Sequence, residues 1–371
     1  MASAPVLSPR ALNRATLDRQ SLLRRAPRAA MDAEAAVRHL VGLQAQNVRP
    51  PYLALAARLA EFDPGELSAL MAERQVARLV TLRSTLHTHT ADDALGLRPL
   101  AQPALERELR AFRSGLVGVD LDMLRERARE LVEEEPRTMK ELRRELLVHW
   151  PDADPFSLSL AARCVLPLVQ TTPRGLWGRG GQVTLTTAGH WFGREPGEPV
   201  SRDDLVTRYL AAFGPASVKD AQTWSGLTRL REVFTRLRPG LVVFRDERGT
   251  ELFDLPDAPR PGPDTPAPPR FLPEYDNLLL SHADRGRVIA RTEHRELTWR
   301  GNQSYPTLLV DGFLAGIWRL TETEGSATLV VQPFEELSRA RREQVAAEGE
   351  RTLATLTDAS SYDIRFGRFL D

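Results

Sequence analysis

The chain has 371 residues, which suits two or three domains and is too long for one small domain. Its 42% hydrophobic and 27% charged residues are typical of a soluble globular protein, and its single cysteine, Cys164, excludes an intrachain disulfide and a cysteine-based metal cluster. The formal net charge of zero counts mildly against a nucleic-acid binder.

The basic residues are strongly biased in type. Of the 50, two are lysines, Lys140 and Lys219, and the others are arginines. The arginine fork suits phosphates and base edges, but a genome rich in G and C also produces this bias. The N-terminus lacks the apolar core of a signal peptide, and no run is long enough to span a bilayer. We therefore expect a cytoplasmic protein without a membrane segment.

Apolar residues at helical spacing predict helices over 11–25 and over 33–44, the second capped by Asp32. Two prolines then start a helix over 52–62, and a short helix follows over 64–74. The next stretch, VARLVTLRSTLHTHT, is rich in β-branched residues and doubles back around Arg83 and Ser84. Several helices closed by a β-hairpin are typical of a winged helix.

The same order of elements recurs twice. Helices over 119–134, 138–149 (capped by Thr138) and 155–170 precede GLWGRGGQVTLTT, where Gly180 and Gly181 predict a tight hairpin turn. Helices over 202–213, 217–225 and 228–238 precede LVVFRDERGTELFDL, whose turn carries Arg248 and Gly249. The pattern predicts an α+β protein with three tandem winged-helix units, over 1–115, 116–200 and 201–255. A generic α+β protein with unrelated hairpins remains the alternative.

The remaining chain differs in composition. Residues 256–270 hold seven prolines and predict an extended linker or a surface strap. Strand patterns follow over 287–291, 305–311, 313–320 and 326–332, and then a charged helix over 335–356. Residues 271–371 are thus expected to form a small antiparallel β unit packed by a terminal helix.

Several common catalytic motifs are absent from the sequence. There is no phosphate-binding loop, dinucleotide fingerprint, HExxH zinc motif or GxSxG hydrolase motif. What remains is nucleic-acid binding by arginine-bearing wings, and a pair of glutamines in HLVGLQAQNVRPPY. Gln44 and Gln46 stand where the helix over 33–44 ends. Polar residues at a helix end often only satisfy free carbonyls, but two amides at that position can also point into one cleft.

Four stretches resemble the AlkZ-type bacterial DNA glycosylases: VGLQAQNVRPPYLALAARL, LRSTLHTHTADD, LVQTTPRGLWGRGG and FLPEYDNLLLSHADR. The hallmark of that family is a glutamine, an apolar or small residue, and a second glutamine. The resemblance extends through nearly the whole chain, in the same order.

The resemblance implies winged helices that form a concave DNA-binding channel. It implies a monofunctional glycosylase, without cofactor or metal, that removes guanines alkylated at the seven-position nitrogen. Bulky adducts and azinomycin-type interstrand crosslinks are included, with self-resistance of the producer as the biological role. The partner is double-stranded DNA with an alkylated guanine, and the protein is expected to act as a monomer.

Gln44 and Gln46 are the expected catalytic residues. We expect Gln46 to hold the attacking water and Gln44 to orient it or to face the deoxyribose. Possible DNA contacts lie on the first hairpin (Arg83, Thr85, His87), on the second wing (Arg174, Trp177, Arg179) and in a C-terminal loop (Arg300, Asn302). Ordinary structural roles stay open for these eight residues: a hydrogen-bonded strand histidine, a core tryptophan and a solvated loop.

Two other functions remain open at this stage. A winged-helix transcription regulator would bind DNA without catalysis, although a sustained dimer helix is not evident in the sequence. A protein that sequesters the lesion or the alkylating drug would bind without turnover.

Overall fold

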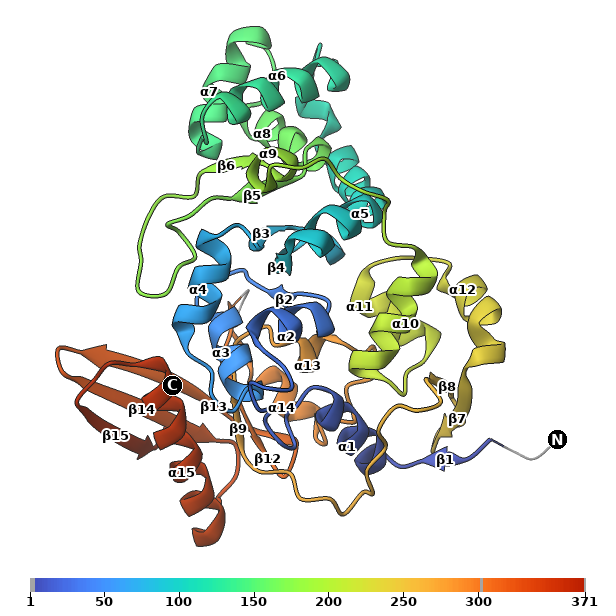
Figure 1. Cartoon of the computed structure of the whole chain (residues 1–371), viewed down its shortest axis with the longest axis vertical. Coiled ribbons are helices and arrows are strands. Elements are labelled where there is room, and N and C mark those ends of the chain that lie inside the picture. Colours follow the sequence, from blue (N-terminus) through green and yellow to red (C-terminus); the bar gives the residue numbers. More distant parts are fainter. Residues whose placement is uncertain (1–3, 301–302, 370–371) are drawn as a thin grey trace.

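The protein is a mixed α and β structure, seen in a computed structural model that describes residues 4–300 and 303–369 (Figure 1). These residues form two five-stranded sheets, a three-stranded sheet and a two-stranded sheet. No helix in these two described ranges is long and apolar enough to cross a membrane. The predicted α+β class is confirmed.

The first part of the chain contains four short helices, as the apolar spacing predicts. They are α1 (Pro9–Arg19), α2 (Ala33–His39), α3 (Pro50–Arg58) and α4 (Pro64–Ala72). The Asp32 side chain accepts a hydrogen bond from the Ala35 N–H at 2.8 Å and caps α2. Proline stands in the first turn of α1, α3 and α4. The N–H that proline lacks would have no partner within the helix at this position.

The predicted helix over 33–44 is wrong at its end. α2 stops at His39, and Val41 and Gly42 then take left-handed backbone angles, with φ of 53° and 91°. A Cβ atom on residue 42 would lie 2.3 Å from the ring of His89, so this close turn needs glycine. The chain continues as the strand β2 (Leu43–Gln44). Local spacing does not reveal this strand, because its hydrogen-bonding partner lies far along the sequence.

β2 is the edge of a sheet with the strand order β2-β4-β3-β5-β6. Its other strands are β3 (Val76–Val80), β4 (Leu86–Thr90), β5 (Leu168–Gln170) and β6 (Leu185–Thr187). The predicted reversal at Arg83 and Ser84 is confirmed, and it takes the form of the short turn η1 (Leu82–Ser84). Because β3 pairs with β5, the first two predicted hairpins share this one sheet.

The tight turn predicted at Gly180 and Gly181 is wrong. β5 and β6 pair antiparallel, but a long loop over 171–184 connects them. Figure 1 shows this green loop leaving the sheet and passing beside α4. The Trp177 N–H donates to Ser68 Oγ of α4 at 2.8 Å, so tertiary contacts hold the loop in place of a hairpin turn.

A long helix that the apolar pattern did not delimit, α5 (Ala91–Ala111), follows β4. It leads to α6 (Leu121–Glu134), α7 (Met139–His149) and α8 (Pro155–Val165). Thr138 and Glu141 form a reciprocal capping box at the start of α7, as the sequence indicates for Thr138. α8 is shorter than predicted, because its last expected residues form β5.

The third helical group follows the prediction closely. After α9 (Ala188–Phe192) come α10 (Arg202–Phe213), α11 (Val218–Ser225) and α12 (Leu230–Leu237). The hairpin of β7 (Val242–Asp246) and β8 (Glu251–Asp254) then turns at the predicted residues. β1 (Val6–Leu7) pairs parallel with β7, so the N-terminal segment completes this sheet.

Residues 256–269 contain no helix or strand and lie along α1, where Arg10 and Arg14 donate to the carbonyls of Pro263 and Thr265. Short elements follow: β9 (Arg270–Leu272), α13 (Asn277–Leu280), α14 (Thr292–Glu296), β10 (Trp299–Arg300) and β11 (Gln303–Ser304). The strand predicted over 287–291 is wrong, because these residues form a turn and loop.

The C-terminal sheet has the order β15-β14-β13-β12-β9. Its remaining elements are β12 (Thr307–Val310), β13 (Phe313–Thr323), β14 (Ser326–Pro333) and β15 (Ser361–Phe366), with α15 (Arg339–Leu356) inserted before the last strand. β15 is parallel to β14, so the predicted all-antiparallel unit is wrong at this edge. The helix expected from 335 begins four residues later.

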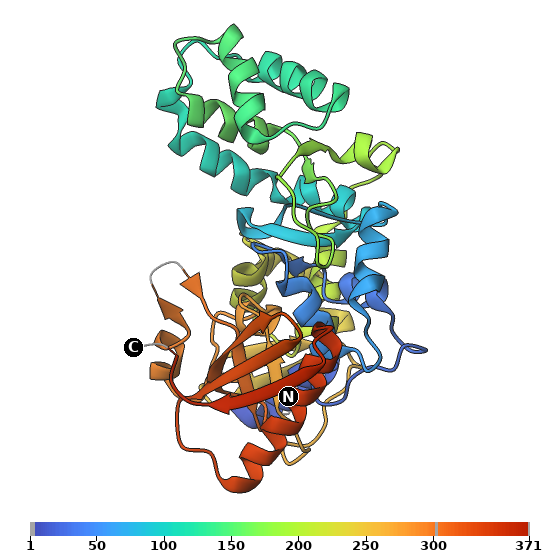
Figure 2. The same cartoon turned by 90° about the vertical axis from the view of Figure 1, so that its left-hand side faces the viewer.

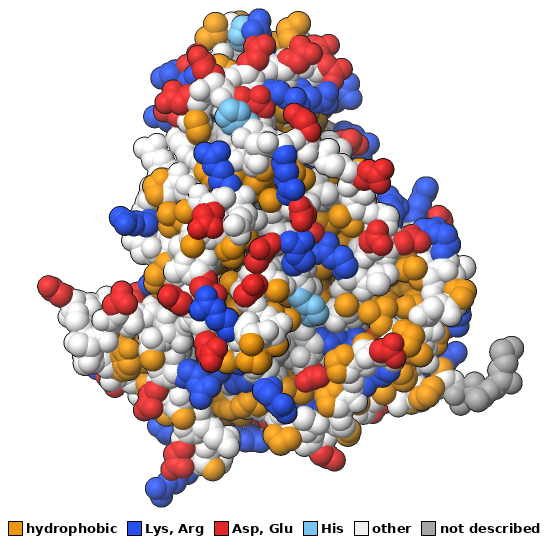
Figure 3. All heavy atoms as spheres, in the orientation of Figure 1, with side chains coloured by type: hydrophobic (Ala, Val, Ile, Leu, Met, Phe, Trp, Pro, Cys, Tyr) orange, Lys and Arg blue, Asp and Glu red, His pale blue; other side chains and the backbone are white. Residues whose placement is uncertain are grey.

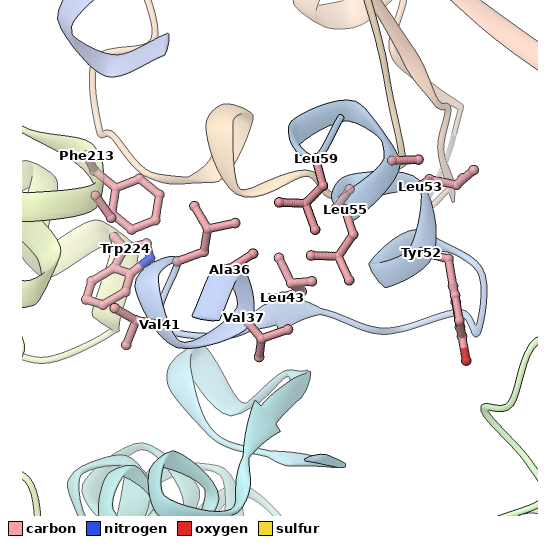
Figure 4. Packing of buried hydrophobic residues seen from close by; sticks show 14 of the residues in the cluster. Ala36, Val37, Val41, Leu43, Tyr52, Leu53, Leu55, Leu59, Phe213 and Trp224 are labelled. Atoms are coloured by element: carbon pink, nitrogen blue, oxygen red, sulfur yellow. The ribbon is translucent and has the colours of Figure 1, made fainter. Parts of the chain in front are cut away.

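One hydrophobic core includes Leu43 of β2. Leu43 lies among side chains of α2 and α3, and Val41 contacts the region of Phe213 and Trp224 from α10 and α11 (Figure 4). The same cluster includes Trp318 and Leu329 of the C-terminal sheet. In Figure 2, α6–α8 lie at one end of the molecule and the C-terminal sheet at the other, with β2–β4 between them. The strand that carries Gln44 is therefore anchored at the centre of the protein.

Candidate active site

Gln44 lies on the strand β2 and not at a helix end, and Gln46 lies just after this strand. Gln44 pairs with His87 in the β2–β4 register, and the Ala45 N–H extends the pairing by donating to the Leu86 carbonyl at 2.8 Å. Gln46 lies beyond the end of β2, in the bend over 46–49. Gln44 is buried, with 8% of its surface exposed, whereas Gln46 is exposed.

Arg83 fixes the amide of Gln44. Its Nη2 donates to Oε1 of Gln44 at 2.9 Å. Because a guanidinium has only donors, this contact assigns the amide: the oxygen faces Arg83, and the NH₂ group points elsewhere. Within the described residues, no atom accepts a hydrogen bond from that NH₂ group. Gln44 therefore offers two free donors to a ligand.

Arg83 is itself held by the fold. It donates to the Trp224 carbonyl at the end of α11 and to Nε2 of His87 at 3.3 Å. Its backbone is left-handed, with φ of 56°, and Gly226 lies so close that a Cβ there would be 3.2 Å from the Arg83 Cα. Burial, and then the charge of Arg285, lower the pKa of Arg83 to about 10, so it stays protonated at neutral pH.

The two histidines of β4 are neutral. His87 accepts from Arg83 at Nε2, so its proton is on Nδ1, which donates to the Thr85 carbonyl at 2.9 Å. Burial, reinforced by Arg83 and His89, holds the pKa of His87 well below its usual value. Burial also lowers the pKa of His89 to about 4, and its Nε2 lies 2.8 Å from Thr81 Oγ1. Neither ring supplies a proton at neutral pH.

Arg78 on β3 holds the main chain between the glutamines, and sequence reasoning did not find it. Its Nη2 donates to the carbonyls of Ala45 at 2.7 Å and Asn47 at 3.3 Å. Arg78 is 3% exposed, and its Nε and Nη1 have no partner among the described residues. Burial, and then Arg174, lower its pKa to about 10. A β-strand arginine in a run of apolar residues was the available signal.

The loop over 171–184 carries the second predicted group. Arg174 is half-buried and donates to the Gly181 carbonyl at 3.1 Å, whereas Arg179 is exposed. The half-buried Trp177 ring packs 4.9 Å from the ring of Tyr52, with the Arg49 guanidinium 5.3 Å from the Trp177 ring centre. Trp177 therefore faces α3 and the residues that follow Gln46.

The other predicted residues are dispersed. Thr85 is half-buried, and its Oγ1 donates to the Leu82 carbonyl at 3.1 Å. Arg300 is exposed on β10, and Asn302 lies outside the described residues. The structure thus brings Gln44, Arg83 and His87 into one hydrogen-bonded cluster and leaves Arg179 and Arg300 apart from it.

A carboxylate lies beside Gln46. The next residue, Asn47, donates through Nδ2 to Oε1 of Glu274 at 2.9 Å. Among the described residues, no arginine, lysine or histidine forms an ion pair with Glu274. The segment over 44–47 thus has two free donors on Gln44, an exposed amide on Gln46, and a half-buried carboxylate nearby.

Neither the pocket of about 990 Å³ nor a metal-ion site among the described residues offers another candidate active site. The pocket lies between α1, α11 and the β7–β8 hairpin and is lined by none of the predicted site residues. No three His, Cys, Asp or Glu side chains in residues 4–300 and 303–369 are placed to hold a metal ion. On the face shown in Figure 3, basic and acidic side chains are interspersed, so DNA contacts there would depend on local arginines.

A family profile, a related protein and a solved structure all relate this chain to DNA glycosylases. The profile of a family described as DNA glycosylase AlkZ-like matches residues 37–355. An interstrand DNA cross-link repair glycosylase of Streptomyces sahachiroi is 26% identical over 349 residues, covering 84% of this chain and 88% of the relative. The solved structure of Streptomyces sahachiroi DNA glycosylase AlkZ superimposes with a TM-score of 0.77 at 22% identity, over 98% of this chain and all of the other. This structural likeness shows a shared fold.

Proposed function

Because the chain belongs to the AlkZ-like family of DNA glycosylases, we propose that it hydrolyses the N-glycosidic bond of 7-alkylguanine in DNA. The observation that carries this proposal is a glutamine pair in which one amide is fixed by Arg83 and the other is open to solvent. Bulky adducts and crosslinks of the azinomycin type are included. The similarity to the interstrand DNA cross-link repair glycosylase of Streptomyces sahachiroi supports crosslink repair.

Cationic lesions explain why amides suffice. Alkylation at the seven-position nitrogen gives guanine a fixed positive charge, so the base leaves neutral and needs little help from an acid. The sugar then becomes oxocarbenium-like, and water adds to it without a strong base. The protein has to position the water and favour the developing charge. The neutral histidines on β4 fit a reaction that needs no general acid.

The proposal gives the two glutamines different roles. The Oε1 atom of Gln44 is engaged by Arg83, so this residue acts through its NH₂ donors and orients the water or the deoxyribose. Gln46 has both its oxygen and its NH₂ group available, and it holds the attacking water. The guanidinium of Arg83 and the NH₂ end of the Gln44 amide are both electropositive, so the oxygen of Gln46 is the group that favours the developing sugar cation.

Strand cleavage is not part of the proposed activity. A lyase reaction needs an amine to form a Schiff base. Lys140 lies on α7 and Lys219 on α11, and among the described residues neither forms a hydrogen bond with Gln44, Arg83 or His87. The product is therefore an abasic site in an intact strand. We propose that the protein acts as a cytoplasmic monomer and that the exposed Arg179 and Arg300 contact DNA phosphates.

The test uses a duplex with a single 7-methylguanine. Release of the free base, with strand breaks that appear only after alkali, is the expected result. An undamaged duplex of the same sequence is the control, because an uncharged guanine is a poor leaving group. A transcription regulator would prefer one DNA sequence and release no base, and a sequestering protein would bind the lesion without turnover.

A further inference from the structure

A second pocket lies next to the segment over 44–47. It has a volume of about 350 Å³ and opens between the loop over 171–184, the start of α3 and the C-terminal sheet. Its lining includes four aromatic residues, Trp177, Tyr305, Trp318 and Phe369. The volume is within the range of pockets that hold small organic ligands.

The pocket begins immediately beyond Gln46. Arg49 lines it and is three residues further along the chain, at most about 11 Å of extended backbone. Glu274 also lines it and accepts the hydrogen bond from Asn47. A group that projects from a substrate bound at Gln46 can therefore enter the pocket over a short tether.

The chemistry of the walls selects flat, aromatic groups. The Arg49 guanidinium lies over the Trp177 ring, 5.3 Å from its centre, and is also paired with Glu322. Leu53 and Leu320 add apolar surface. Aromatic faces and a guanidinium bind planar π systems better than they bind aliphatic groups of similar size.

We propose that this pocket receives the planar aromatic part of a bulky substituent on the alkylated guanine. The inference rests on the proposed function, and it adds a specificity site to it. The alkylated base itself must stay close to Gln46, because its glycosidic bond reacts with the water held there. The pocket lies past the Asn47–Glu274 contact, so it accommodates what the base carries and not the base.

Three duplexes test this assignment, with a single 7-methylguanine, 7-benzylguanine or 7-(cyclohexylmethyl)guanine. The variants are Leu320→Trp, which fills the pocket, and Tyr305→Leu, which removes an aromatic face. Tyr362→Leu is the control, because Tyr362 is an exposed aromatic residue on β15 that does not line the pocket. Both kcat/KM for base release and equilibrium binding of each duplex are measured.

The wild type is expected to prefer the benzyl lesion over the cyclohexylmethyl lesion by about tenfold, the size of one aromatic stacking contact. Both pocket variants should lose this preference and keep their activity on 7-methylguanine, and the control should keep both. Equal losses on all three lesions would assign the pocket to the base or to the DNA backbone and overturn the proposal. An unchanged preference in both variants would also overturn it. Benzyl-selective binding without any base release would support the pocket while contradicting the glycosylase function.

Discussion

Arg83 and Gln44 are joined by a 2.9 Å hydrogen bond across 39 positions of sequence. Arg83 is at the tip of the β3–β4 reversal and Gln44 is on the edge strand, so the fold orients the amide of Gln44 through a second element. Trp224 of α11 binds the same guanidinium, which connects this orientation to the third helical group.

This relationship predicts the effect of Arg83→Met. Without the guanidinium, the Gln44 amide is free to rotate, and the loss of a charged hydrogen bond corresponds to a decrease in kcat of about tenfold to a hundredfold. The measurement is single-turnover release of 7-methylguanine. Arg127→Met is the matched control, because Arg127 is exposed on α6 and pairs only with Glu130 among the described residues. An unchanged rate in Arg83→Met would show that Gln44 needs no orientation.

Arg78 gives a second prediction, about the main chain. Arg78→Met removes the donor to the Ala45 and Asn47 carbonyls, so the strand segment between the glutamines loses its anchor. We expect release to slow by about tenfold, with a KM that changes little. Arg98→Met is a close control, because Arg98 is also buried and donates to two carbonyls, those of Cys164 and Leu166, away from the glutamines. If Arg78→Met and Arg98→Met lose similar stability and release the base at equal rates, a positioning role for Arg78 is contradicted.

Gly42 gives a prediction for stability. Alanine at 42 would strain a backbone at φ 91° and drive its Cβ into the His89 ring, at a cost of about 3 kcal/mol. Gly118→Ala, at φ 69° with nothing within 4 Å of the new atom, should cost about 1 kcal/mol through backbone strain alone. Urea unfolding measures both. Equal costs would mean that the contact with His89 does not determine this turn.

The buried histidines predict how stability depends on pH. The pKa is lowered to about 4 for His89 and to about 3 for His282, in both cases mainly by burial, and the pKa of His87 is also well below its usual value. As the pH falls below about 6.5, the unfolded chain takes up protons at these positions and the folded protein does not, so the free energy of unfolding decreases. Thermal unfolding between pH 7.5 and 4.5 should show a falling Tm. A Tm that is constant over this range would contradict the burial of neutral histidines.

The same shifts predict the pH dependence of catalysis. Because neither His87 nor His89 titrates near neutrality, single-turnover release should be nearly constant from about pH 6 to pH 9. A rate that rises or falls tenfold per pH unit within this window would reveal an acid or base that the proposed mechanism lacks.

Local signals in the sequence predicted much of the fold. The Thr138 cap, the bounds of α10 and the reversal at Arg83 and Ser84 depend on neighbouring residues, and the structure confirms them. β2 and the β14–β15 pair could not be predicted in this way, because their hydrogen-bonding partners are distant in the chain. The sequence indicated the glutamine pair through a family resemblance. It did not indicate the contact of Gln44 with Arg83 or the anchor Arg78, because these partners are also distant in the chain.

The most direct test of the proposed chemistry compares the wild type with Gln44→Ala, Gln46→Ala and Gln46→Asp on a duplex that contains one 7-methylguanine. Loss of water positioning should slow release in both alanine variants by about a hundredfold, while the affinity for the duplex is retained. Gln46→Asp keeps an oxygen acceptor for the water and should retain activity. Release at the wild-type rate in both alanine variants would contradict the assignment of the glutamine pair as the catalytic centre.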